Sequence, residues 1–110
     1  GKPIYLGMSQ GGDIGFTLAS HDGDRFRLFI PIAGRLLEEE IVSRRTAGKV
    51  RIHHGEKDPI VPIIRAREAA IRLQSVGMDV TLREYVGTEH VLTKEIRKAI
   101  LDDIYTVVQE

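Results

Sequence analysis

A Gly-x-Ser-x-Gly motif near the N-terminus places a serine where it could act as a nucleophile. Gly7-Met8-Ser9-Gln10-Gly11 follows an apolar run over residues 3–6, and a helix-like stretch comes directly after it. A serine in this context occupies a tight strand-to-helix corner, where the two glycines leave room for the crossing chain. Its hydroxyl would project above the sheet, and the following amide would point at a developing oxyanion. The alternative interpretation is a Gly- and Ser-rich turn that opens an ordinary helix.

Asp58 and His90 could activate this serine, because each follows the end of a predicted strand. A serine hydroxyl needs a base within hydrogen-bond reach; His90 would take its proton while Asp58 holds the other ring nitrogen. Taken singly, His90 could be a surface histidine and Asp58 a turn former. Because the carboxyl ends of parallel strands meet at one edge of a sheet, all three residues are expected on the same rim. The residues expected to contact the oxyanion or the substrate are Met8, Gln10 and Gly11.

The remaining polar clusters are weaker candidates for chemistry. His53 and His54 are adjacent on a strand, so their side chains point to opposite faces and cannot jointly hold one metal ion. His54 is expected to pack or bond near the Asp58 loop, and His53 to face a helix or solvent. The glutamates at 38–40 are interpreted as a solvated face rather than a metal site. The sequence therefore predicts chemistry without a cofactor or a metal.

Periodicity predicts alternating strands and helices. The expected strands cover residues 3–8, 27–33, 49–54 and 79–86, and the expected helices cover 10–20, 64–76 and the stretch from Thr93 to 108. The segment 35–48 gives a poor pattern, in which 36–42 could be a short helix. Alternation of this kind predicts an α/β fold, with about four mainly parallel strands in a three-layer α/β/α arrangement.

Some positions make these expectations sharper. Pro31 lacks an amide donor, so it should lie near the C-terminal end of its strand or at a bulge. Arg51 and His53 put polar groups on one face of the third strand, which predicts a thinly covered face. In the first helix, Ile14 is expected to contribute to the core. In the last helix, one apolar stripe is expected to run from Ile96 to Val108.

Length and composition bound the class of protein. The 110 residues suit a single domain over 1–110. Sixteen basic residues balance sixteen acidic ones, so no global field favours nucleic acid or an anionic membrane. The sequence has no cysteine, which excludes disulfides and thiolate metal sites within it. No apolar run approaches the roughly twenty residues that span a bilayer, and we expect a cytoplasmic location.

Three blocks give the sequence a family resemblance: Ile4 to Gly12, His54 to Pro62 and Gly87 to His90. It resembles the carboxylesterase/phospholipase branch of the α/β-hydrolases, the group that includes acyl-protein thioesterases and dienelactone hydrolases. The order Ser, Asp, His along the chain is the one expected of α/β-hydrolases. The resemblance implies a nucleophilic Ser9, an acidic Asp58 and a basic His90 acting on small carboxylic esters or thioesters.

The resemblance covers only the C-terminal half of such enzymes, which are about twice as long. The early strands, the first helix and the loop that normally supplies a second oxyanion amide have no counterpart here. Losing one such donor typically lowers turnover by about two to three orders of magnitude. Three functions therefore stay open: a slow serine esterase for short acyl esters, a half-domain that needs the other half in trans, and an inactive structural module.

The first predicted strand raises the question of assembly. In a full-length relative, the strand over 3–6 would have a neighbour on each side, whereas here one side lacks its neighbour. Unpaired strand edges lead to association. We therefore expect a two-fold homodimer, formed through this strand edge or through the adjoining face that the last helix borders.

Overall fold

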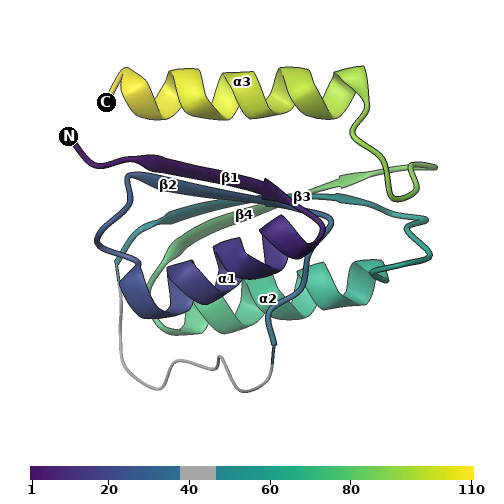
Figure 1. Ribbon diagram of the computed structural model, residues 1–110, viewed down its shortest axis with the longest axis horizontal. Helices are drawn as coiled ribbons and strands as arrows, with labels where there is room; N and C mark the ends of the chain where they lie inside the picture. Colours follow the sequence, from purple (N-terminus) through teal and green to yellow (C-terminus); the bar gives the residue numbers. More distant parts are fainter. Residues whose placement is uncertain (38–46) are drawn as a thin grey trace.

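The computed structural model describes residues 1–37 and 47–110, and these residues form one sheet with helices on both of its faces. The strands are β1 (Ile4–Met8), β2 (Leu28–Ile32), β3 (Lys49–Gly55) and β4 (Asp79–Tyr85), and the helices are α1 (Gln10–Asp22), α2 (Ile63–Ser75) and α3 (Lys94–Val108). All neighbouring strands pair in parallel, in the order β1-β2-β3-β4. Figure 1 shows α1 and α2 on one face and α3 on the other. The predicted three-layer α/β/α architecture is confirmed.

Observed element boundaries lie within about two residues of the predicted ones. The largest difference is in α1, which is predicted over 10–20 and continues for two more residues, to Asp22. Pro31 is the fourth of five residues in β2, opposite Gly7 of β1, as its missing amide predicts. Most of the short helix expected over 36–42, with the glutamates at 38–40, lies outside the described residues.

Two clusters of buried side chains hold the layers together. Phe16 of α1 and Leu73 of α2 pack against Phe29 of β2 on one face of the sheet. Ile96 and Ile100 of α3 belong to the cluster on the other face. Full burial of one such side chain contributes roughly 1.5–3 kcal/mol. The apolar faces of the helices therefore account for the three layers.

Two residues expected in the core are exposed. Ile14 of α1 is 54% exposed and Val108 of α3 is 51% exposed. The buried residues of α1 include Gly12, Gly15, Phe16 and Ala19, an i, i+3, i+4, i+7 stripe that excludes Ile14. Val108 follows the buried Val107, and one residue along a helix turns the side chain by about 100°. The helical period explains both errors.

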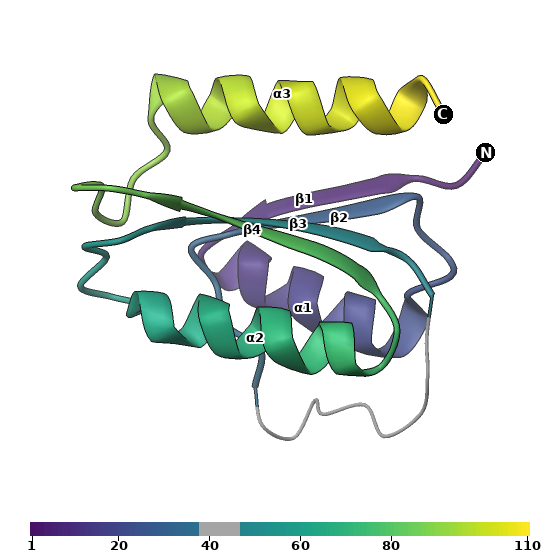
Figure 2. The ribbon, with the colours of Figure 1, turned by 180° about the vertical axis from the view of Figure 1, so that it is seen from behind.

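The two faces of the sheet are unequally covered, as the polar third strand predicts. Within the described residues, α3 is the one helix on its face, and Figures 1 and 2 show it lying over β1 and β2. Both views place the two termini side by side at one end of the sheet. There, Arg27 Nη2 donates to the Val107 carbonyl (2.9 Å), and Lys49 forms an ion pair with Glu110. These contacts attach the end of α3 to β3 and to the chain just before β2.

Candidate active site

Ser9 lies at the sharp corner between β1 and α1. Its φ of 59° and ψ of −116° are strained for a residue other than glycine. Two backbone hydrogen bonds hold this conformation: the Ser9 amide donates to the Ile32 carbonyl (2.8 Å), and the Asp13 amide donates to the Ser9 carbonyl (3.0 Å). Strain of this kind persists only where the surroundings enforce it, and here the neighbouring strand β2 and the first turn of α1 do so.

The first glycine of the motif is required by close packing at this corner. A Cβ on Gly7 would lie 2.6 Å from the carbonyl carbon of Gly11, closer than real Cβ contacts. On the same side, the Tyr5 hydroxyl donates to the Gly11 carbonyl at 2.7 Å. The need for glycine at position 7 therefore follows from a helix that folds directly back over its strand, whereas a Cβ on Gly11 would meet only the Tyr5 hydroxyl, at an ordinary 3.9 Å.

Asp58 lies in the loop after β3, with its side chain fully buried. Its Oδ1 accepts hydrogen bonds from the amides of Ile60 and Val61, both at 2.8 Å. Its Oδ2 lies 2.6 Å from Nδ1 of His90. Burial by itself raises the pKa of Asp58, but the bonds from Val61, His90 and Ile60 outweigh it, so the pKa falls below the ordinary aspartate value. This carboxyl group is held in its ionised form.

His90 lies in the loop between β4 and α3, which is bonded to the Asp58 loop. The amide of Lys57 donates to the Thr88 carbonyl at 2.9 Å, and the amide of Glu56 donates to the last residue of β4 at the same distance. A Cβ on Gly55 would collide with the carbonyl oxygens of Thr88 and Glu89. The bare glycine thus lets the two loops approach closely enough for His90 to meet Asp58.

The three side chains form one hydrogen-bonded series. Nε2 of the half-buried His90 lies 3.0 Å from Oγ of Ser9, while Nδ1 lies 2.6 Å from the Asp58 carboxylate. Because an ionised carboxylate only accepts hydrogen bonds, Nδ1 carries a proton, and Nε2 of a neutral ring can accept the serine proton. This is the geometry of a serine nucleophile with an oriented base.

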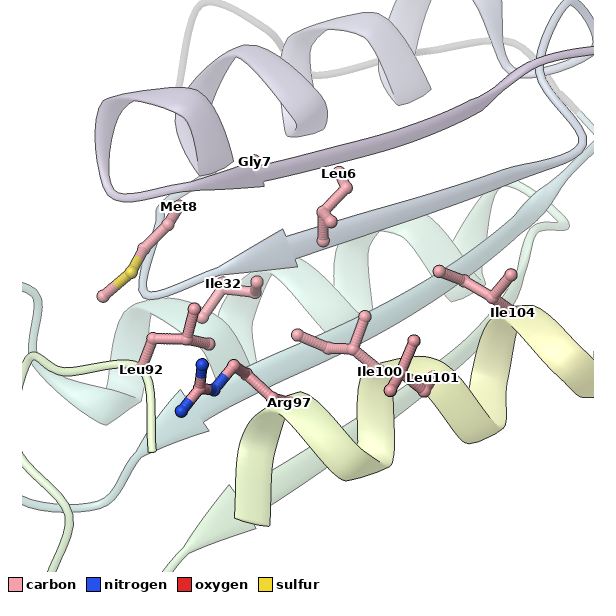
Figure 3. A pocket seen from close by; sticks show the side chains of 9 residues that line it. All are labelled: Leu6, Gly7, Met8, Ile32, Leu92, Arg97, Ile100, Leu101 and Ile104. Atoms are coloured by element: carbon pink, nitrogen blue, oxygen red, sulfur yellow. The ribbon is translucent and has the colours of Figure 1, made fainter. Parts of the chain in front are cut away.

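An apolar groove of about 440 Å³ lies between β1 and α3, and Figure 3 shows the side chains that line it. Met8, Leu92 and Arg97 lie at the end of β1, and Leu6 and Ile104 lie farther along the groove. Of the residues predicted to contact substrate, Met8 lines this groove, while Gln10 and Gly11 lie in the first turn of α1. The sequence did not indicate Leu92 or Arg97. The sequence signal that could have located the groove was the apolar stripe of the last helix, next to a first strand with one unpaired edge.

The adjacent histidines occupy different surroundings. His54 Nε2 lies 2.6 Å from the carbonyl oxygen of Val61 in the Asp58 loop, as predicted. His53, on the opposite face of the sheet, lies 2.8 Å from the Tyr85 hydroxyl and 2.6 Å from the Asp103 carboxylate. His53 therefore joins β3 and β4 to α3; the sequence predicted that it faces a helix or solvent, but not its partners Tyr85 and Asp103.

Residues 1–37 and 47–110 hold neither a metal-binding cluster nor a membrane-spanning helix. They contain no group of three or more His, Asp or Glu side chains placed to hold a metal ion. None of their helices combines the length and apolar character needed to cross a membrane.

Comparison with known proteins assigns the sequence to a family. The family model described as phospholipase/carboxylesterase matches residues 2–108. The chain belongs to the phospholipase/carboxylesterase family. No curated protein sequence matches it at a significant level.

Solved structures share its fold at low sequence identity. They include SOBER1 of Arabidopsis thaliana, which is 18% identical with a TM-score of 0.82 over 96% of this chain and 52% of its own. The carboxylesterase of Bacillus cereus is 23% identical with a TM-score of 0.76, over 87% of this chain and 46% of its own. Esterase PE8 is 24% identical with the same TM-score, over 94% and 49% respectively. The chain therefore spans about half the length of these structures.

Proposed function

We propose that this chain is a serine hydrolase that cleaves small carboxylic esters or thioesters with short acyl groups. The observation that carries the proposal is the series of hydrogen bonds from Ser9 through His90 to Asp58. Membership of the phospholipase/carboxylesterase family supports the same class of reaction. No cofactor is required, because the serine itself supplies the nucleophile.

The proposed reaction passes through an acyl-enzyme. Ser9 Oγ attacks the ester carbonyl carbon while its proton moves to Nε2 of His90, and Asp58 stabilises the imidazolium that forms. The tetrahedral intermediate then expels the alcohol, which takes the proton from His90. Water attacks the acyl-serine in the second half of the cycle, giving up its proton to His90 and releasing the carboxylic acid. Ser9 then regains its proton from His90, and the starting state is restored.

The amide of Gln10 is the proposed donor to the oxyanion. Gln10 is the first residue of α1, and amides in the first helical turn have no partner within the helix. The positive end of the helix dipole also favours negative charge at this point. With one such donor in place of two, turnover would be about two to three orders of magnitude slower.

A fluorophosphonate probe tests the nucleophile directly. The purified protein should form a covalent adduct on Ser9, detected by peptide mass spectrometry, and hydrolyse a short-chain chromogenic ester with an initial burst. Ser9→Ala should remove the adduct and the burst, whereas Ser75→Ala, on the far helix α2, should leave both intact. Ester turnover that is unaltered in Ser9→Ala would exclude the proposed mechanism.

A second candidate function is a half-domain that becomes active with a partner. The open edge of β1 and the apolar groove beside Met8 favour this alternative. A partner on that edge could wall the groove and offer a second oxyanion donor. The test adds the N-terminal half of a related enzyme in trans: probe labelling that appears only with this addition would favour the half-domain. A chain unlabelled under both conditions would be a structural module.

A further inference from the structure

His54 contacts the loop that holds the proposed catalytic acid, although it touches neither Ser9 nor His90 through a hydrogen bond in the described residues. It is the sixth residue of β3, and its side chain is 0% exposed. Nε2 lies 2.6 Å from the Val61 carbonyl oxygen. Because a carbonyl only accepts hydrogen bonds, Nε2 carries the proton. Within residues 1–37 and 47–110, Nδ1 has no partner, so Nε2 makes the polar contact of this ring.

Val61 connects His54 to the carboxylate of Asp58. The Val61 amide donates to Oδ1 of Asp58 at 2.8 Å, while the Val61 carbonyl accepts from His54. His54 thus holds Val61 in place, and the Val61 amide in turn holds Oδ1 of the Asp58 carboxylate. The same Nε2 lies 3.7 Å from Oδ2, the oxygen that His90 binds. This distance is too long for a hydrogen bond, but it places the positive end of an N–H dipole beside that oxygen.

We propose that His54 is a positioning residue: it clamps the Asp58 loop through Val61, so that Oδ2 faces His90 in the orientation that catalysis needs. This inference rests on the proposed function. His54 would transfer no proton and would touch no substrate. Its effect would pass through the orientation of Asp58, and a displacement of about 1 Å in a catalytic group can cost about 100-fold in rate.

Two amide variants separate this role from general packing. The side-chain nitrogen of glutamine reaches about as far as Nε2 of histidine, whereas that of asparagine reaches only as far as Nδ1. His54→Gln can therefore keep the bond to the Val61 carbonyl, and His54→Asn cannot. We expect His54→Gln to retain most of the kcat for a short-chain ester and His54→Asn to lose about 100-fold, with KM little changed.

His53 provides a matched control in the same strand. It is as deeply buried, but its ring contacts Tyr85 and Asp103 on the opposite face of the sheet. We expect both His53→Asn and His54→Asn to lower the melting temperature, but His53→Asn should leave kcat close to that of the unaltered protein. A loss of kcat common to both asparagine variants would assign both histidines a structural role and overturn the proposal.

Proton NMR gives a readout that does not depend on activity. The short bond between His90 and Asp58 should give a far-downfield Nδ1–H resonance, assigned by its loss in His90→Gln. We expect this resonance to persist in His54→Gln and His53→Asn, and to shift or disappear in folded His54→Asn. An unchanged resonance in His54→Asn would refute the positioning role even if the protein proved inactive. An unlabelled Ser9 with the expected resonance changes would refute the proposed function alone.

Discussion

At the scale of single residues, the buried carboxylate of Asp58 is the charge that the site stabilises. Its carboxylate is buried with neutral amide donors on Oδ1 and a histidine on Oδ2. Amide hydrogen bonds and the His90 ring replace the water that an exposed carboxylate would bind. The pKa of Asp58 is lowered as a result, and a lowered pKa in the folded state means that folding is linked to pH.

This linkage predicts how acid destabilises the protein. A carboxyl whose folded-state pKa lies below its unfolded value of about 3.9 stabilises the fold at higher pH. Its contribution is lost as pH falls through the folded-state pKa. We expect urea unfolding to show Asp58→Asn less stable than the unaltered protein near neutrality, and the difference to shrink as pH falls below about 4. A difference that stays constant from acid to neutral pH would contradict this account.

At the scale of secondary-structure elements, the C-terminal ends of three strands position the site. Ser9 follows β1, Asp58 follows β3 and His90 follows β4, so parallel pairing brings their loops to one edge of the sheet. This convergence could be predicted from sequence because apolar runs and turn residues mark each strand end. The chemistry of the residues then followed from their types, before any distance was known.

Other features of the structure depend on packing between distant segments, which local sequence patterns do not indicate. Asp103 meets His53 across fifty residues of chain, and the period of α3 shows nothing special at Asp103. The lining of the groove by Leu92 and Arg97 depends on how α3 lies over β1. Ile14 was misplaced because apolar character alone does not say which arc of a helix faces the sheet. The prediction and the structure therefore differ where a feature depends on contacts between residues that are far apart in the sequence.

Contact between two loops gives a prediction at this scale. Gly55→Ala would force its Cβ against the carbonyl oxygens of Thr88 and Glu89, and the loop carrying His90 would have to move. A shift of about 1 Å in the base should lower kcat by about 100-fold. Kinetics on the folded variant, checked by circular dichroism, measure this effect. Activity within twofold of the unaltered protein would show that the loops adapt without moving His90.

The whole molecule presents two very different sheet edges. Exposed polar residues occur along β4, among them Asp79 and Arg83, which suits a strand that must avoid pairing. Its counterpart β1 is apolar, and its Leu6 is 50% exposed beside the groove. Across the groove, Leu101 of α3 is also exposed, and so is Tyr105 of the same helix. Apolar surface next to an unpaired strand favours association.

A second copy of this chain is the partner that we propose for the β1 edge. The formal net charge is zero, so no long-range repulsion opposes self-association. A two-fold axis would pair the two copies of β1 antiparallel, joining four strands from each copy into one sheet. Leu6→Lys places a charge in this apolar contact, whereas Ile71→Lys places one on exposed α2. Sedimentation velocity should show a dimer for the unaltered protein and Ile71→Lys, and a monomer for Leu6→Lys. An unaltered protein that stays monomeric at micromolar concentration would exclude this dimer.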